Sequence, residues 1–333
     1  MANSLITSEA PFDQDGKHTG FLRVPHSVTT SAYGWLPIPI CAIQNGIGPT
    51  LLISAGNHGD EYEGQIAVTK LIQTLDADDI HGRLILLPMT NAPAAEAGTR
   101  TSPIDDGNLN RSFPGDPAGT PTQMIAHYIE EVLLPMCDYA VDLHSGGTSL
   151  HYPATLLRGR AHSPEEEAGL NLLSDAFDPP YAWVFTGGGG TTSIARTAMG
   201  AANRKGVINI MAELGGGGTI DADILADTER GLHRILHAIK MLLAYEPDAP
   251  RSTRALNAQG SVFAYDTGLL ELLKGIGDPV TKDETIALVH DPATPWRAPI
   301  PVTSPHEGIV LAKRHLTQVK RGDAIVQIAK DAP

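Results

Sequence analysis

Two short segments place imidazole and carboxylate side chains where they can share one metal ion. His58 and Glu61 lie three residues apart, directly after an apolar segment at residues 50–55, and His144 directly follows another at residues 139–143. Zinc accepts imidazole nitrogen and carboxylate oxygen at about 2.0–2.2 Å, and only three protein ligands leave a position for water, as in catalytic sites. The pattern therefore predicts one Zn²⁺ per chain. The alternative is that His58 is an ordinary loop residue and Glu61 a first-turn carboxylate favoured by a helix dipole.

A third apolar segment carries a carboxylate that is suited to moving protons. Glu213 lies near the end of residues 207–214, and four glycines follow it at residues 215–218. In this position a carboxylate can take a proton from water and deliver it to a leaving amine. The alternative, a carboxylate that caps the next helix, is disfavoured by the four intervening glycines. Asp142 stands two residues before His144, on the same side of a strand, and is predicted to orient a histidine.

The segment between these motifs supplies groups for an anionic substrate. In residues 107–115, Arg111 offers a planar guanidinium fork for a carboxylate, and Asn110 adds an amide donor. Arg100, earlier in the same loop, is placed to stabilise a developing oxyanion. Together with a metal-activated water, these groups predict hydrolysis of an amide in a small substrate that carries a carboxylate.

Other motifs in the chain are weaker. Ser145, His144 and Asp142 resemble a serine-hydrolase triad, but no Gly-x-Ser-x-Gly elbow occurs, and adjacent residues on one strand point to opposite faces. The glycine runs at 187–190 and 215–218 continue into neither a P-loop nor a dinucleotide motif. We interpret both runs as loops that line the cleft.

Apolar segments alternate with helical patterns over the first three quarters of the chain. The predicted strands are rich in Ile, Leu and Val, which is typical of strands buried on both faces of a mostly parallel sheet, and lie at residues 50–55, 83–88, 139–143 and 207–214. Helical spacing occurs at residues 63–75, 122–134, 164–177 and 222–245. The alternation predicts an α/β domain over residues 1–248, with a mixed, largely parallel sheet flanked by helices. Pro37 and Pro39 favour edge strands near the N-terminus.

Residues 249–333 lack helical periodicity and predict a small C-terminal all-β domain. Residues 268–289 and 308–328 form a weak internal repeat. Each half alone leaves an apolar face uncovered, so we expect the two to pair about a pseudo-two-fold axis into a flattened sandwich. The pattern resembles the barrel-sandwich fold of biotinyl and lipoyl domains, but the connecting segment at 290–297 contains no lysine to modify. We therefore expect a structural lid or assembly element rather than a carrier domain.

Composition narrows the function classes further. The formal net charge of −14 disfavours phosphate backbones and anionic lipid, so we expect neither a nucleic-acid nor a membrane partner. No apolar run reaches about 18 residues, and the N-terminal residues lack the pattern of a signal peptide. Cys41 and Cys137 are the only cysteines and form no disulfide framework. These features predict a cytoplasmic protein with a small-molecule substrate, and they leave a homo-oligomer possible.

Four motifs, in their order and spacing, resemble the succinylglutamate desuccinylase/aspartoacylase family. They are GNHGDEYEG, NLNRSFPG, DLHSGG and AELGGGG. The resemblance implies a zinc carboxypeptidase-like fold with an appended β domain, and it implies a role for each matching residue: zinc on His58, Glu61 and His144, the substrate carboxylate on Asn110 and Arg111, and Glu213 as the general acid/base. The family's arginine before the Asn-Arg pair is best matched by Arg100, although the spacing is longer here. The family also borrows a tyrosine from its β domain, for which Tyr265 is the candidate.

The flanking sequence is similar to one branch of that family. The stretches GFLRVPHS, SAYGWLPIPI and GNHGDEYEGQIAV resemble the branch that deacetylates N-α-acetyl-L-2,4-diaminobutyrate in ectoine breakdown. This implies release of acetate and a diamino acid, and Asp60 is then placed to pair with the free γ-ammonium, unless it is simply a solvated loop residue. The alternatives are a deacylase of the N-acetylaspartate or N-succinylglutamate type, a small-peptide carboxypeptidase, and a non-catalytic metal- or ligand-binding protein.

Overall fold

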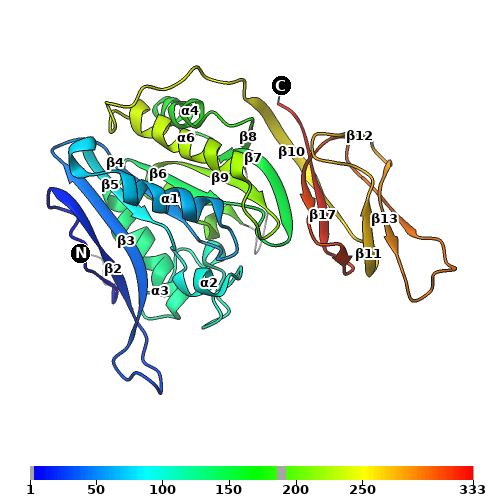
Figure 1. The fold of residues 1–333 in the computed structure, drawn as a ribbon, viewed down its shortest axis with the longest axis horizontal. Helices are drawn as coiled ribbons and strands as arrows, with labels where there is room; N and C mark the ends of the chain where they lie inside the picture. The colour runs from blue at the N-terminus through cyan, green and yellow to red at the C-terminus, as the bar shows by residue number, and fades with distance from the viewer. Residues whose placement is uncertain (1–3, 186–192, 333) are drawn as a thin grey trace.

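A large mixed β-sheet runs through the computed structural model, which describes residues 4–185 and 193–332 (Figure 1). In the described residues this sheet has thirteen strands in the order β1-β2-β3-β5-β4-β6-β9-β7-β8-β10-β17-β15-β12. Their bounds are β1 Thr7–Ser8, β2 Gly16–Pro25, β3 Trp35–Asn45, β4 Thr50–Ala55, β5 Gly82–Leu87, β6 Tyr139–His144, β7 Leu150–Arg158, β8 Tyr181–Val184, β9 Ile208–Gly216, β10 Arg254–Phe263, β12 Pro279–Val280, β15 Gly308–Arg314 and β17 Ala324–Asp331.

The four strands predicted from apolar segments form the parallel centre of this sheet. β4 pairs in parallel with both β5 and β6, and β6 pairs in parallel with β9. Successive side chains of one strand enter opposite cores: Leu51 and Ile53 of β4 pack into one cluster, and Leu52 into the other. Burial on both faces explains why these segments are apolar throughout rather than alternating.

Strand β3, which contains Pro37 and Pro39, lies inside the sheet, but over half of its length only one neighbouring strand pairs with it. β3 pairs with β2 from Trp35 to Asn45, whereas β5 pairs only with Cys41–Asn45. Pro37 and Pro39 therefore lie in the half of β3 that one neighbour alone contacts, where a missing N–H is tolerated. The edge character predicted from the prolines holds for this half, and not for β3 as a whole.

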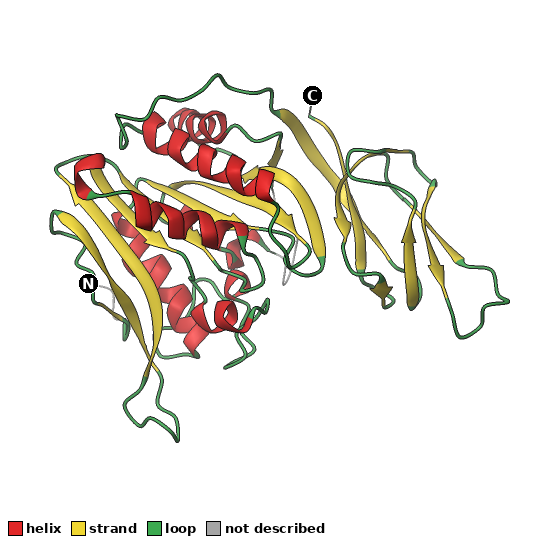
Figure 2. Ribbon diagram, viewed as in Figure 1, coloured by secondary structure: helices red, strands yellow, loops and turns green. Residues whose placement is uncertain are grey.

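Helices cover both faces of the sheet (Figure 2). Their bounds are α1 Glu63–Thr74, α2 Ala92–Ala97, α3 Pro121–Tyr128, α4 Pro164–Phe177, α5 Ala198–Arg204 and α6 Ala222–Ala238. Helices α1, α4 and α6 share one apolar core with the sheet, and α3 and α5 share the other. The predicted start of α4 is confirmed, because Ser163 Oγ accepts the N–H of Glu166 at 3.1 Å.

Two predicted helices differ from the observed ones at their C-terminal ends. The helix expected at 222–245 ends at Ala238, because Lys240 adopts a left-handed φ of 63° and reverses the chain. The helix expected at 122–134 is α3 followed by a wider π turn at Ile129–Leu133 and a 3-10 turn at Leu134–Met136. This second segment is thus helical over residues 121–136, slightly beyond the predicted bounds, and its winding changes along its length.

The C-terminal β region, Arg254–Asp331, contains two interleaved halves. Half of its strands continue the large sheet in the order β10-β17-β15-β12, and the rest form a second sheet in the order β14-β13-β11-β16. The strands of this second sheet are β11 Gly268–Leu272, β13 Thr285–His290, β14 Ile300–Thr303 and β16 Gln318–Val319. Each strand from β10 to β13 has a counterpart four strands later in the chain, from β14 to β17. When every strand is replaced by its counterpart, the order of one sheet becomes the order of the other. This is the pseudo-two-fold arrangement expected from the repeat.

Backbone hydrogen bonds join this region to the α/β part of the chain. β10 pairs in parallel with β8, and Lys313 and Arg314 of β15 pair with His151 and Leu150 of β7. Because the large sheet is continuous through these pairs, the boundary between residues 248 and 249 stays a prediction. The pairing also brings the C-terminal β region close to the carboxyl ends of the central strands.

Candidate metal centre and active site

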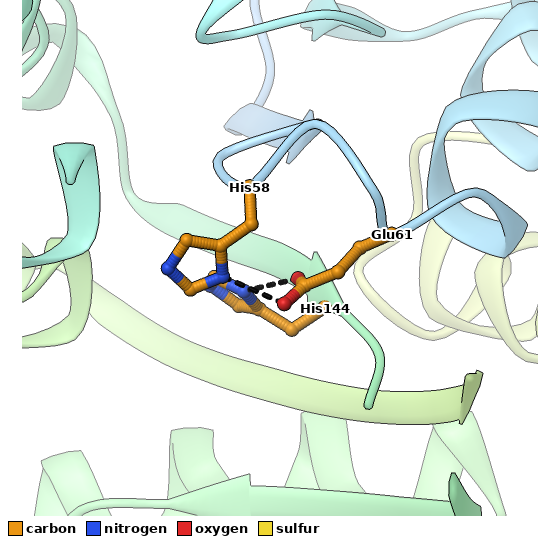
Figure 3. Close-up of side chains that lie close together, drawn as sticks. All are labelled: His58, Glu61 and His144. Carbon is orange, nitrogen blue, oxygen red and sulfur yellow. Dashed lines mark hydrogen bonds and ion pairs between the residues drawn. The ribbon is translucent and has the colours of Figure 1, made fainter. Parts of the chain in front are cut away.

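His58, Glu61 and His144 converge at the carboxyl ends of two neighbouring parallel strands (Figure 3). Because β4 and β6 run side by side, the loop after β4 and the last residue of β6 meet at one edge of the sheet. His58 Nδ1 lies 2.6 Å from Glu61 Oε1, and His144 Nδ1 lies 2.8 Å from Glu61 Oε2. The ligand atoms of all three buried residues lie within 4.8 Å of one another.

The second nitrogen of each histidine faces a protein oxygen. His58 Nε2 is 3.2 Å from Asn108 Oδ1, and His144 Nε2 is 2.8 Å from Asp142 Oδ2. When each Nε2–H donates to its oxygen, the neutral ring presents the Nδ1 lone pair toward Glu61. Two imidazole nitrogens and one carboxylate, oriented in this way, fit the donor set of a zinc ion.

The charges buried around this point favour a cation. Burial opposes ionisation of Glu61, but the neighbouring His58 and His144 lower its pKa well below the usual value. Burial opposes a charge on His144, whereas Asp142 and Glu61 raise its pKa. The raised pKa shows that the two buried carboxylates favour a positive charge at His144, and a divalent ion held by the neutral imidazole would supply such a charge.

Glu213 lies in the strand next to β6, beside the candidate metal ligand His144. In β9 it is in register with His144 of β6 and Thr155 of β7. Its Oε2 is buried and has no hydrogen-bond partner among the described residues. Burial, followed by the charge on Glu61, raises the pKa of Glu213 to about 8. A carboxyl group with such a pKa both accepts and releases protons near neutral pH.

The glycines after Glu213 are needed by the backbone. All four residues from 215 to 218 have positive φ, between 68° and 130°. A Cβ on Gly216 would also lie 2.2 Å from the carbonyl oxygen of Leu150. β9 extends to Gly216, so Glu213 lies inside the strand, and the run is only partly the loop that we expected. The run at 187–190 lies outside the described residues.

Arg100 and Asn110 line a cavity of about 250 Å³ together with the three candidate metal ligands. Arg100 Nη1 lies 3.4 Å from Glu61 Oε1, and its side chain is about half exposed. Asn110 Oδ1 accepts the N–H of Ala198 at 3.0 Å, and its amide nitrogen, the donor of the group, lies 3.3 Å from His144 Nε2. The structure therefore places both residues where they can contact a substrate at the metal centre.

Arg111 adds a second guanidinium to the same cavity. It follows Asn110 in the short 3-10 turn η2, Leu109–Arg111. Burial, followed by the positive charges of Arg100 and Arg196, lowers the pKa of Arg111, although it remains a cation. Positive charge concentrated in this way attracts a carboxylate.

Two predicted site residues lie away from this cavity. Asp60 is buried, its Oδ2 accepts the backbone N–H of Thr148 at 2.7 Å, and its Oδ1 has no hydrogen-bond partner among the described residues. Tyr265 is 47% exposed in the turn after β10. Neither residue is among those that line the cavity, and their roles in substrate binding stay predictions.

Two polar residues that the sequence interpretation omitted do line the cavity. Tyr152, in β7, is 5% exposed, and Gln327, in β17, comes from the C-terminal β region. Burial, followed by the charge of Glu213, raises the pKa of Tyr152 well above its usual value, so the phenol stays protonated. A sequence signal existed for Gln327, because it interrupts an apolar strand between Val326 and Ile328. It could not show which face of the strand meets the cavity.

Among the described residues, no helix is both long and apolar enough to span a membrane. Residues 47–239 match the family model of the succinylglutamate desuccinylase/aspartoacylase catalytic domain. The chain is 41% identical to the N-α-acetyl-L-2,4-diaminobutyric acid deacetylase of Halomonas elongata, over 98% of this chain and 95% of that protein.

Solved structures agree with the sequence comparison. The product-bound ectoine utilization protein EutE (DoeB) of Ruegeria pomeroyi superposes with a TM-score of 0.93 and 36% identity, covering 99% of this chain and 100% of that one. A succinylglutamate desuccinylase/aspartoacylase from Rhodobacter sphaeroides superposes with a TM-score of 0.91 and 33% identity, with the same coverage. The resemblance seen in the four sequence motifs is confirmed, and the chain belongs to the succinylglutamate desuccinylase/aspartoacylase family.

Proposed function

We propose that this protein is a zinc-dependent deacetylase that converts N-α-acetyl-L-2,4-diaminobutyrate to acetate and L-2,4-diaminobutyrate. The observation that carries the hydrolase chemistry is the convergence of His58, Glu61 and His144 beside Glu213. The choice of substrate is supported by the 41% identity to a deacetylase of that name along nearly the whole chain.

Different cavity residues bind different groups of the substrate. Arg111 and the amide nitrogen of Asn110 bind the α-carboxylate, because they supply a cation and a donor on the same short turn. Arg100 approaches the metal-binding carboxylate, where it donates to the acyl oxygen as negative charge develops on it. This places the scissile amide between the two arginines, next to Glu213.

Glu213 carries the proton between water and the leaving group. As a base it accepts a proton from the attacking water, and as an acid it then gives that proton to the departing α-amine. Its buried carboxyl group, with a pKa raised to about 8, is suited to both transfers. Zinc, when held by the two histidines and Glu61, supplies Lewis acidity that polarises the acyl carbonyl and makes water more acidic.

The test is release of acetate from purified protein, measured with and without a chelator. We expect N-α-acetyl-L-2,4-diaminobutyrate to be hydrolysed faster than N-acetylaspartate, N-succinylglutamate or an acetylated dipeptide. Activity lost on chelation should return with Zn²⁺. Faster hydrolysis of N-acetylaspartate or N-succinylglutamate would replace the proposed substrate, and a metal-loaded protein that is inert toward all four compounds would favour a binding function.

The cytoplasmic location and a homo-oligomeric state remain predictions. Fractionation of cells that express the tagged protein tests the first. Light scattering of the purified protein tests the second, and a mass near 35.3 kDa would identify a monomer.

A further inference from the structure

Gln327 brings an unpaired acceptor from the C-terminal β region into the cavity. It lies in β17 and lines the cavity together with the metal-binding residues. Its Oε1 is buried and has no hydrogen-bond partner among the described residues. A buried acceptor without a partner costs free energy, and a donor on a bound ligand would remove that cost.

Tyr152 lines the same cavity as Gln327. Because Gln327 Oε1 is buried there without a hydrogen-bond partner among the described residues, this acceptor is available to a ligand. The phenol is itself buried and protonated, so it does not compete as an anion.

The backbone around Gln327 is held on both sides. In β17 it pairs with Ser261 of β10 and with Ala312 of β15. One residue further along β15, Lys313 pairs with His151, the residue before Tyr152. Gln327 is therefore placed by the same strand pairs that attach the C-terminal β region to the catalytic part, and a side chain held in this way can discriminate between ligands.

The other charged groups of the cavity are already used by the proposed reaction. Glu61 completes the metal centre and Glu213 moves the proton. Among the cavity-lining residues that the structure describes, the guanidinium or ammonium side chains are those of Arg100 and Arg111. In the proposed reaction, Arg100 binds the acyl oxygen and Arg111 binds the α-carboxylate. A substrate with a second carboxylate near Gln327 would therefore find no cationic side chain there to pair with it. The remaining wall is apolar and includes Leu157, Trp183 and Met211.

We propose that Gln327 is a specificity-determining residue whose Oε1 accepts an N–H from the ammonium group on the substrate's side chain. This inference rests on the proposed function. Gln327 takes the place of Asp60 as the proposed partner of that ammonium group, because Asp60 is not among the residues that line the cavity. A site built around a hydrogen bond to a donor rejects the analogue that lacks it, since the acceptor is then left unpaired.

The test compares two substrates of nearly the same shape in three variants of the full-length protein. N-α-acetyl-L-2,4-diaminobutyrate and N-acetyl-L-norvaline differ by an ammonium group in place of a methyl group. Gln327→Leu removes the acceptor at similar size, and Gln327→Glu keeps an oxygen there. Gln259→Leu is the matched control, because Gln259 is exposed in β10 of the same region.

The quantity measured is the ratio of kcat/KM for the two substrates at equal zinc content. Gln327→Leu should lower the preference for the ammonium substrate about tenfold or more, the usual effect of losing a hydrogen bond to a charged group. Gln327→Glu should keep the preference, and Gln259→Leu should behave as wild type. Calorimetric binding of the products, L-2,4-diaminobutyrate and L-norvaline, should show the same order without depending on turnover.

The outcomes separate the two proposals. A wild-type preference that survives in Gln327→Leu, in both kinetics and product binding, would overturn the role of Gln327 and leave the proposed function intact. A wild-type protein that shows no preference for the ammonium substrate would overturn the proposed substrate, and the Gln327 inference with it.

Discussion

Replacing Glu213 by glutamine isolates the proton-transfer step from metal binding. The two side chains have nearly the same shape, but the amide neither accepts a proton from water nor supplies one to an amine. Glu213 Oε2 has no hydrogen-bond partner among the described residues, so the substitution removes no contact of that atom. Its neighbour in the next strand, His144, keeps its contacts with Glu61 and Asp142.

The expected loss follows from what a positioned general acid/base contributes. Such groups typically accelerate a reaction by about 10²–10⁴-fold, which corresponds to ~2.7–5.4 kcal/mol of the barrier. Glu213→Gln should therefore retain one zinc ion per chain and a wild-type melting transition, while kcat falls by about two to four orders of magnitude. KM should change little, because the substrate carboxylate is bound elsewhere in the cavity.

The assay pairs acetate release with metal analysis of the same sample. Zinc content by mass spectrometry establishes that the His58, Glu61 and His144 centre is filled. A fully metal-loaded Glu213→Gln protein with kcat within about threefold of wild type would refute the assignment of Glu213 as the proton carrier. Loss of zinc together with activity would instead show that Glu213 supports the metal centre.

Three further predictions test other parts of the structure. Arg111→Lys should lower kcat/KM by about tenfold or more, because an ammonium group cannot form the paired contact of a guanidinium; a substrate with its carboxylate converted to an amide should be insensitive to the change. Gly59→Ala should weaken zinc binding and stability, since its Cβ would lie 1.9 Å from the carbonyl oxygen of Ala94, whereas Gly159→Ala, with its nearest contact at 3.6 Å, should be tolerated. Burial raises the pKa of Cys41 to about 11 and that of Cys137 to about 12, so both thiols are almost entirely protonated at pH 8. They should react with a thiol reagent only after unfolding, and rapid reaction in the native protein would contradict this.

The metal centre was predictable because its residues follow strands that the sequence shows directly. Strands buried on both faces are apolar at every position, as in β4 and β6, and such runs need no tertiary information to be seen. Once the strands are known to be parallel, their carboxyl ends share an edge, and His58 and His144 are brought together. Local pattern and sheet geometry thus suffice for this part of the site.

Strands with mixed composition were not visible in the same way. β7 begins Leu150-His151-Tyr152-Pro153 and was missed, because proline and polar residues interrupt its apolar run. It pairs with β9 through a register shift between Tyr152 and Thr155, which no periodicity in the sequence indicates. Tyr152 was therefore absent from the predicted site although it is among its most buried members.

The position of Gln327 depends on pairings that span much of the chain. Lys313 of β15 pairs with His151 of β7, and β10 pairs with β8; these two pairings between distant parts of the chain place β17 beside the cavity. In the proposed function, chemistry and selectivity therefore come from different parts of the protein: the candidate metal ligands and Glu213 belong to the parallel strands and the loops after them, and Gln327 belongs to the C-terminal β region. Substitutions in β15 or β17 can thus alter which side chain is accepted without touching a metal ligand. The lid or assembly role expected for this region from sequence stays a prediction, and it omits the contribution of Gln327 to the cavity wall.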